Sequence, residues 1–239
     1  MTGSPPRVYL LDVEGTIAPI SLVSEQLFPY ARAHVAEFLK QNLTRPDVQA
    51  DLKLLAEENR AEESELSPTF GIEIRNELHA RAYLAWLMEN DRKSTALKSL
   101  QGKIWKSGFE NGTLKGTLFP DVPAAIERWA KQARVAIYSS GSTEAQQLLF
   151  RYSVYGDLTP HVSGYFDTRT GAKGDSASYA AIAVSTSTAP SEVLFFSDVV
   201  RELDAAREAG CLTRLVVREG NAPVEDPHGH GIITSFESL

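Results

Sequence analysis

The chain has 239 residues, a formal net charge of -7 and a pI near 5.3, with 43% hydrophobic and 23% charged residues. A chain of this length can bury a substantial apolar interior, either as one large domain or as a core with a smaller second domain. Its acidic balance argues against a general affinity for nucleic acid or anionic membrane, although a local basic pocket could still hold one phosphate. The expected partner is therefore a small molecule.

Cys211 is the only cysteine, which excludes an internal disulfide and gives no sign of a cysteine-based zinc or redox site. The first residues lead into a short apolar run, without the long apolar region of a signal peptide or a membrane span. These features predict a cytoplasmic protein, with a nuclear presence open for a eukaryotic source. The oligomeric state stays open, and a monomer is one expectation.

Apolar runs and helical patterns follow one another along much of the chain. The runs, each typical of a buried strand, are residues 8–13, 135–138, 193–196 and 212–217. Between the later runs, apolar spacing predicts helices over residues 121–132, 143–152, about 176–184 and 199–209. Strands that alternate with helices predict an α/β fold, in which a Rossmann-like parallel sheet is covered on both faces.

Residues 24–107 do not follow this alternation. The stretch is too long for a loop and has helical periodicity, with four apolar stripes that begin near Leu27, Thr44, Leu78 and Leu97. It is expected to be an all-helical cap domain inserted into a catalytic core domain of residues 1–23 and 108–239. The glycine-containing stretch 108–116 is the expected hinge back into the core.

Polar residues stand where the apolar runs end, and one lysine lies in a loop between two of them. In chain order they are Asp12, Glu14, Ser139, Ser140, Lys173 and Asp198. Each alone has a simpler interpretation, as a turn former, a helix start, a solvated surface charge or a helix cap. Ligands of open parallel sheets gather at the carboxyl ends of the strands, however. Taken in order, the residues therefore predict one catalytic site.

The residue types suit phosphoryl transfer. Asp12 can attack phosphorus and form an aspartyl-phosphate, which splits one slow displacement into two easier ones. Glu14, two positions along the extended strand end, can protonate the leaving oxygen and later activate water. Mg²⁺ prefers oxygen ligands, and Asp12 and Asp198 could hold it from two adjacent strands. Ser139 and Lys173 could then clamp the phosphoryl oxygens.

The motif order resembles that of the haloacid dehalogenase superfamily: Asp-Val-Glu-Gly-Thr at 12–16, an apolar strand into Ser139, then Lys173, then an apolar strand into Asp198. Several further segments resemble the enolase-phosphatase family of methionine salvage, also called acireductone synthase. They include residues 19–21, 27–32, 102–105, 108–112, 120–123, 138–142, 165–168, 197–199 and 233–236. The resemblance covers nearly the whole chain.

This resemblance implies a fold of haloacid dehalogenase type and one Mg²⁺ per subunit. It also implies a bifunctional enzyme that enolises 2,3-diketo-5-methylthiopentyl-1-phosphate and then removes phosphate to give the acireductone 1,2-dihydroxy-3-keto-5-methylthiopentene. By match of motif, the metal positions are Asp12, Glu14 and Asp198. The catalytic positions are Asp12, Glu14 and Lys173, and the substrate-binding positions are Ser139, Ser140 and Lys173.

Three other functions remain as alternatives. A generic magnesium-dependent phosphatase of the same superfamily would differ only in the substrate that the cap admits. A dehalogenase also uses an aspartate nucleophile, but it needs no acid two residues later, so Glu14 argues against it. A phospho-accepting signalling receiver would lack the inserted cap and would be about half as long.

Two further groups have simpler interpretations than a site. His228 and His230 have a spacing that metal ligands use, but they lie in a stretch rich in glycine and proline, and a metal role is not expected. Phe28, Tyr30, Trp105 and Phe109 could line a pocket for the methylthio group, although apolar residues at helical spacing are more often core.

Overall fold

The computed structural model describes residues 5–237 and residue 239, and its chain divides into two compact units. One unit consists of the described residues up to Leu22 together with those from Leu114 onward. The other unit is Val23–Thr113. The sequence pattern predicts 24–107 for the inserted part.

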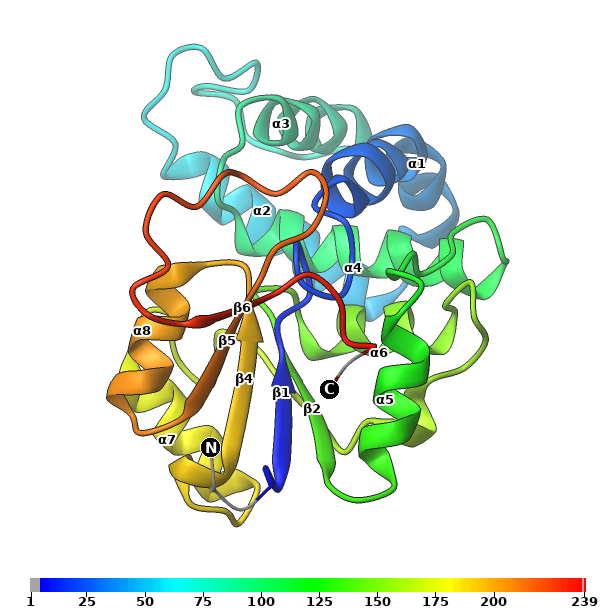
Figure 1. Ribbon diagram of the computed structural model, residues 1–239. Helices are drawn as coiled ribbons and strands as arrows, with labels where there is room; N and C mark the ends of the chain where they lie inside the picture. The colour runs from blue at the N-terminus through cyan, green and yellow to red at the C-terminus, as the bar shows by residue number, and fades with distance from the viewer. Residues whose placement is uncertain (1–4, 238) are drawn as a thin grey trace. The chain divides into compact units, whose positions relative to one another are not determined.

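The first unit is built on a six-stranded sheet in which every neighbouring pair of strands is parallel, with the order β3-β2-β1-β4-β5-β6 (Figure 1). The strands are β1 Val8–Leu11, β2 Arg134–Tyr138, β3 Gly164–Phe166, β4 Val193–Ser197, β5 Leu212–Val216 and β6 Gly231–Ile233. In β1, Leu11 lies level with Ile137 of β2 and with Phe196 of β4. The expected parallel α/β sheet is therefore confirmed, with the first strand between the second and the fourth.

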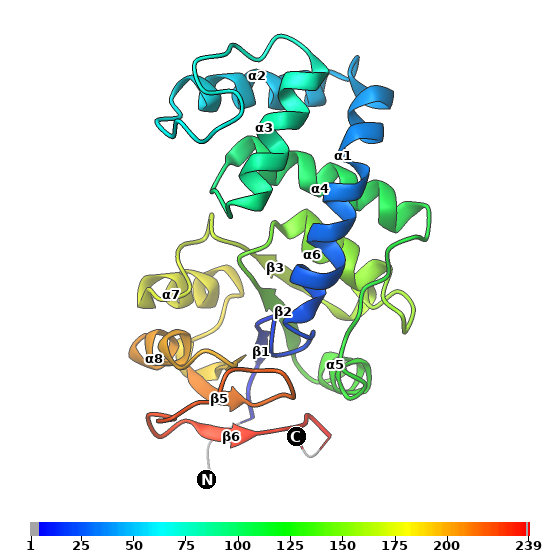
Figure 2. The ribbon, with the colours of Figure 1, turned by 90° about the horizontal axis from the view of Figure 1, so that it is seen from above.

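Helices cover both faces of this sheet, α7 and α8 on one face and α5 and α6 on the other (Figures 1 and 2). Their bounds are α5 Val122–Ala130, α6 Thr143–Arg151, α7 Ser176–Ser185 and α8 Val200–Glu208, and two short 3-10 helices are Thr159–His161 and Pro190–Glu192. Side chains of a strand point alternately to its two faces. Val8 and Leu10 accordingly pack in the cluster that contains Tyr179 of α7, whereas Tyr9 stacks on Trp129 of α5 with ring centroids 4.5 Å apart.

Two of the strands were not expected from the sequence. β3 and β6 have only three residues each and no fully buried residue, so they lack the continuous apolar run that identifies a buried strand. They are the two edge strands of the sheet. The other four strands begin and end within two residues of the expected positions.

The second unit consists of helices, and none of its described residues forms a strand. A π-helical segment, Leu22–Leu27, leads into four helices, α1 Phe28–Asn42, α2 Pro46–Arg60, α3 Glu77–Glu89 and α4 Thr95–Glu110. The side chains of Asn76 and Ser94 cap α3 and α4 by accepting from the backbone N–H of the third residue beyond. Buried residues of all four helices form one apolar core. The all-helical character of the insertion is thus confirmed.

Two details of this unit differ from the sequence prediction. Leu78 is 69% exposed and lies outside the core, because it falls in the first turn of α3 on the solvent side. Gly108 belongs to α4 and not to a hinge. A Cβ at Gly108 would come within 2.6 Å of the Tyr30 ring, so this glycine permits close packing inside the helical unit.

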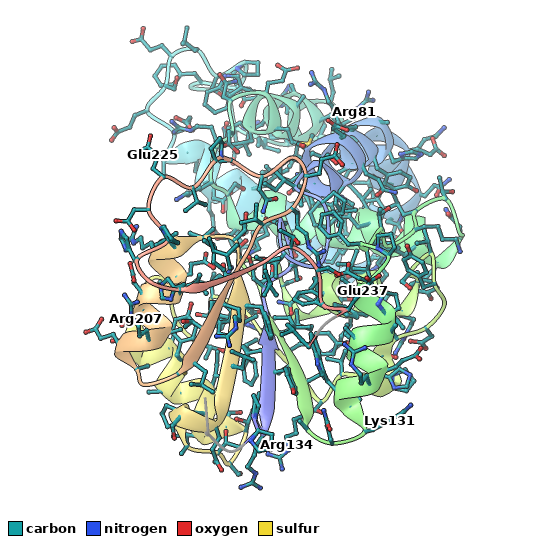
Figure 3. The ribbon with its side chains drawn as sticks, viewed as in Figure 1. Arg81, Lys131, Arg134, Arg207, Glu225 and Glu237 are labelled. Atoms are coloured by element: carbon teal, nitrogen blue, oxygen red, sulfur yellow. The ribbon has the colours of Figure 1, made fainter. Side chains whose placement is uncertain are left out.

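The two ends of the strands differ in character. Lys131 at the end of α5 and Arg134 at the start of β2 project from the surface where the strands begin (Figure 3). The acidic residues singled out in the sequence lie beyond the opposite, carboxyl ends. No helix in the described part of the chain is long and apolar enough to cross a membrane.

Candidate active site

Asp12 follows the central strand β1 directly and is 5% exposed. Its backbone N–H donates to the carbonyl of Phe196 at 3.0 Å, which continues the pairing of β1 with β4 by one residue. The carboxylate therefore projects from a rigid strand end between two neighbouring strands. This is the position at which parallel sheets present their functional groups.

Lys173 reaches the Asp12 carboxylate from the loop between β3 and α7. Its Nζ lies 2.5 Å from Oδ1 of Asp12 and 2.7 Å from Oε2 of Glu202, and its side chain is only 12% exposed. Burial acts to lower the pKa of the Lys173 ammonium, but Asp12 and Glu202 outweigh burial and hold that pKa above its usual range. Lys173 is therefore a fixed positive charge between two acids.

Glu202 is the site residue that the sequence analysis missed. It lies in the first turn of α8, where it pairs with Lys173 and accepts a hydrogen bond of 3.0 Å from the hydroxyl of Ser197. Burial, and next the charge of Asp12, raise the pKa of its carboxyl. One signal could have found it, because an acid in the first turn of a helix that follows a strand end is both favoured by the helix dipole and directed to the ligand edge of the sheet.

Asp198 follows β4 and lies against the loop after β1. A Cβ at Gly15 would come within 2.2 Å of its Oδ2, so only glycine fits there, and the φ of +73° at Gly15 also favours glycine. The backbone N–H of Asp198 donates to the hydroxyl of Thr16 at 3.1 Å. Burial, followed by the negative charge of Asp12, raises the pKa of the Asp198 carboxyl to about 7.

Glu14 lies in the tight loop after Asp12, in which the backbone N–H of Gly15 donates to the carbonyl of Ala18. Burial raises the pKa of its carboxyl, Asp12 raises it further, and Lys173 acts in the opposite direction. A carboxyl group in such surroundings is protonated more readily than one in water, which suits a general acid.

Ser139 and Ser140 follow β2, the neighbour of β1 on the other side. Ser139 is buried, and its hydroxyl accepts from the backbone N–H of Gly141 at 3.1 Å. Gln146 of α6 donates both to the carbonyl of Gly141 and to that of Phe166, which fixes this loop against β3. The ion pairs that join Asp12, Lys173 and Glu202 do not include Ser139, whose hydroxyl serves the turn of its own loop.

Two side chains from the end of the chain hold the loop that carries Glu14. Asn221 donates to the carbonyl of Gly15 at 2.9 Å, and Arg218 donates to the carbonyl of Thr16 at 3.1 Å. The side chain of Arg218 is buried, with its guanidinium 3.0 Å from Asp121 and near the rings of Phe119 and Phe236. The loop is therefore fixed by contacts that no local sequence pattern reveals.

The donor set of the site suits a hard cation. Asp12, Glu14, Asp198 and Glu202 influence one another's charge, and Lys173 is the ammonium among them. Within the part of the chain that the structure describes, no group of three or more His, Cys, Asp or Glu side chains is arranged to hold a metal ion by itself. Mg²⁺ needs no such cage, since it often binds through one or two carboxylates and keeps several waters.

His228 and His230 are held by hydrogen bonds in the surface segment that packs on α8. The Nδ1 of His228 lies 2.6 Å from Asp204, and the Nε2 of His230 lies 3.1 Å from the same carboxylate. The other ring nitrogen of His230 meets the hydroxyl of Thr213 at 2.7 Å. Both nitrogens of His230 are thus engaged, and the pair serves to fasten this segment to the helix.

Comparisons with known proteins agree with the fold. Residues 6–210 match the family model described as haloacid dehalogenase-like hydrolase. The chain is 54% identical over 217 residues to a protein of Synechococcus elongatus named "Enolase-phosphatase E1", with 90% of each chain covered.

Two further similarities extend over nearly the whole chain. A Vitis vinifera protein named "Probable bifunctional methylthioribulose-1-phosphate dehydratase/enolase-phosphatase E1 1" is 42% identical over 98% of this chain and 47% of its own length. The crystal structure of the UTR4 protein of Saccharomyces cerevisiae is similar with a TM-score of 0.80, at 38% identity, and covers 98% of this chain and 100% of its own. The chain therefore belongs to the haloacid dehalogenase-like hydrolases and, among them, to the enolase-phosphatase family.

Proposed function

We propose that the chain is a bifunctional enolase-phosphatase of methionine salvage. It would convert 2,3-diketo-5-methylthiopentyl-1-phosphate to 1,2-dihydroxy-3-keto-5-methylthiopentene and phosphate. The observation that carries the proposal is the contact of 2.5 Å between Lys173 and Asp12, which places a buried ammonium on a buried carboxylate at the end of the central strand. A second support is the dehydratase named in the Vitis relative, whose action on methylthioribulose-1-phosphate would supply a dehydrated keto phosphate to the enolase-phosphatase part of the same protein.

In the phosphatase step, Asp12 would attack phosphorus while the bond between phosphorus and the substrate oxygen breaks. Glu14 would give its proton to the departing oxygen, which its raised pKa favours. Water would then attack phosphorus of the aspartyl-phosphate and lose its proton to Glu14. Phosphate would leave, and Asp12 and Glu14 would return to their starting states.

Substrate oxygens would be held from two sides of Asp12. Lys173 already lies on the Asp12 carboxylate and would contact a phosphoryl oxygen as negative charge builds up there. Ser139 and Ser140 follow the adjacent strand β2 and would donate from their hydroxyls and loop N–H groups. Glu202 would act as a positioning residue, since it pairs with the Lys173 ammonium at 2.7 Å.

Asp12 and Asp198 would hold Mg²⁺, one ion per subunit, with Glu14 close by in the third position that the family resemblance implies. When bound, the ion would offset the repulsion between carboxylate and phosphate and would polarise a substrate oxygen. The fit rests on the donor set, because the oxygens of Asp12 and Asp198 follow neighbouring strands and are of the kind that Mg²⁺ prefers. Burial, followed by the negative charge of Asp12, raises the pKa of both Asp198 and Glu14, and a bound cation would offset that negative charge.

Enolisation would use the same site before phosphate is removed. A base takes a proton from the carbon next to a substrate carbonyl, and the oxygen of that carbonyl is protonated as the double bond moves. Glu14 is our choice for this proton transfer, because burial raises the pKa of its carboxyl, and such a carboxyl takes up a proton more readily than one in water.

The remaining assignments also belong to this proposal. The helical unit, expected as residues 24–107, would act as a cap that selects the substrate for the core of residues 1–23 and 108–239. A cytoplasmic location fits the single cysteine, Cys211, which is buried and unpaired. A small phosphorylated substrate, and no nucleic acid, fits the acidic composition.

The deciding experiment supplies the purified protein with the diketo phosphate and Mg²⁺, and follows enol absorbance and phosphate release separately. Transient enol absorbance that precedes phosphate release supports the bifunctional assignment. A panel of other phosphomonoesters tests the generic phosphatase. Equal kcat/KM across that panel, without any enol signal, would replace the proposal by the generic alternative.

A further inference from the structure

Three consecutive backbone carbonyls around Lys173 accept hydrogen bonds from side-chain hydroxyls. The pairs are Tyr138 Oη with the carbonyl of Gly171 (3.0 Å), Ser178 Oγ with that of Ala172 (2.8 Å) and Tyr179 Oη with that of Lys173 itself (2.7 Å). Residues 171–173 lie outside every helix and strand of the structure. The regular backbone ladders therefore do not fix this segment. The three hydroxyls do so, together with one turn hydrogen bond from the backbone N–H of Asp175 to the carbonyl of Ala172 at 3.1 Å.

The three donors belong to rigid parts of the core. Tyr138 ends β2, and Ser178 and Tyr179 lie in the first turn of α7. All three residues are at most 2% exposed. The two tyrosine rings meet edge to face with centroids 5.6 Å apart, and Tyr179 also packs on Phe195 of β4. Neither ring can turn without disturbing the sheet, so each hydroxyl is a fixed point.

The backbone approaches these donors unusually closely. A Cβ at Gly171 would come within 2.1 Å of the Ser178 hydroxyl oxygen, and Gly171 has a φ of +146°. A glycine at this position thus lets the segment lie against the start of α7. The segment then delivers the Lys173 side chain to Asp12 and Glu202 at 2.5 and 2.7 Å.

We propose that Tyr138, Ser178 and Tyr179 are positioning residues for Lys173, whose hydroxyls hold the backbone so that the ammonium stays between Asp12 and Glu202. The proposal rests on the role given above to Lys173 in phosphate transfer. Tyr179 contributes most to this positioning, because its hydroxyl donates to the carbonyl of Lys173 itself. A small displacement of a catalytic group lowers the rate far more than it lowers binding.

The test uses the isosteric variant Tyr179→Phe and the milder Ser178→Ala, with folding checked by circular dichroism. We expect Tyr179→Phe to lower kcat for phosphate release about tenfold, with KM changed less than about threefold. We also expect faster reaction of Lys173 with an amine-directed acylating reagent, read by mass spectrometry of the labelled peptide, because a displaced ammonium is less protected.

Tyr165→Phe is the matched control. The hydroxyl of Tyr165 is buried and has no hydrogen-bond partner among the described residues, so its removal should change neither kcat nor labelling. If Tyr179→Phe and Ser178→Ala are folded and behave like Tyr165→Phe in both measurements, the positioning role is wrong.

A separate variant distinguishes this failure from failure of the proposed function. If Lys173→Met releases phosphate at the wild-type rate, the role of Lys173 in catalysis is wrong. The labelling of Lys173 in Tyr179→Phe then still decides whether the hydroxyls position the ammonium. If Lys173→Met is inactive, Tyr179→Phe should have no further effect on the Kd for inorganic phosphate in that background, because both changes act through one ammonium. An additional loss of phosphate affinity there would contradict the proposal.

Discussion

Thr16 and Asp198 join the ends of two neighbouring strands, through a hydrogen bond of 3.1 Å from the backbone N–H of Asp198 to the Thr16 hydroxyl. Thr16 is fully buried. Its side chain thus links the loop after β1, which carries Glu14, to the loop after β4, which carries Asp198. We therefore expect the spacing of the two proposed metal ligands Asp12 and Asp198 to depend on this contact.

Thr16→Val should therefore weaken metal binding without removing a ligand. Valine has nearly the same shape but cannot accept the Asp198 N–H, so a buried donor loses its partner at a cost of about 1–3 kcal/mol. We expect about a fivefold or greater increase in the Mg²⁺ concentration needed for half-maximal rate, and a lower urea midpoint. Thr16→Ser keeps the hydroxyl and is the control. An unchanged Mg²⁺ requirement in Thr16→Val would show that the contact does not set the ligand spacing.

Asp12→Asn should separate the two half-reactions. The amide cannot attack phosphorus, so phosphate release should fall by at least about a thousandfold. Enolisation needs a base and a polarised carbonyl but no nucleophile, so the enol phosphate should still form and accumulate. Enol absorbance and phosphate are measured in the same sample. A folded Asp12→Asn protein that forms no enol phosphate would show that Asp12 also takes part in the first step.

Glu14→Gln should impair both half-reactions. Its raised pKa suits a group that both gives and takes protons, and glutamine can do neither. We expect enol formation and phosphate release each to fall about a hundredfold or more, while the affinity for inorganic phosphate changes little. Rapid-mixing measurements of the two signals provide the check. Full enol formation in Glu14→Gln would show that another residue is the base in the enolisation step.

The metal-free protein should be less stable at pH 8 than at pH 6. The Asp198 carboxyl has a pKa of about 7 in the fold, above its usual value of 3.8, so between these values the folded chain binds more protons than the unfolded chain. Stability from this group is therefore lost as the pH rises through about 7. In EDTA, Tm should fall between pH 6 and pH 8, and it should fall less in Asp198→Asn, whose side chain does not titrate.

The same variant tests the metal site. Mg²⁺ added at pH 8 should raise Tm in the wild type and should raise it less in Asp198→Asn, since binding to the folded state alone adds stability. Activity should also disappear in EDTA and should need much more Mg²⁺ in the variant. Equal pH slopes for wild type and Asp198→Asn in EDTA, or full activity after chelation, would contradict the assignment of Asp198.

The sequence predicts those residues of the candidate site that directly follow a buried strand. A buried strand is a continuous apolar run, and the residue after it lies at a known edge of the sheet, which is why the sequence alone places Asp12 and Asp198. The sequence does not predict β3 and β6, because a strand of three residues that are not fully buried has no such apolar run. The catalytic roles themselves stay predictions until the variants are measured.

A different reason explains why the sequence does not identify Glu202, Tyr179 and Arg218. Glu202 and Arg218 act on residues far away in the chain, at Lys173 and Thr16, whereas Tyr179 reaches back six residues to the carbonyl of Lys173 across an irregular loop. Glutamate in a helix, tyrosine at helical spacing and arginine near a turn are ordinary in such places. Only the pairing of strands and helices in space gives these side chains their partners.

The contacts of Arg218 and Asn221 with the loop at Gly15 and Thr16 span 202 and 206 residues of chain. On the ribosome, the loop that carries Glu14 is made long before the two side chains that hold it. The helical unit Val23–Thr113 has its own apolar core, so it can fold while most of the sheet is still unsynthesised. The loop after β1 then gains these two supporting contacts only after the ribosome has passed Asn221.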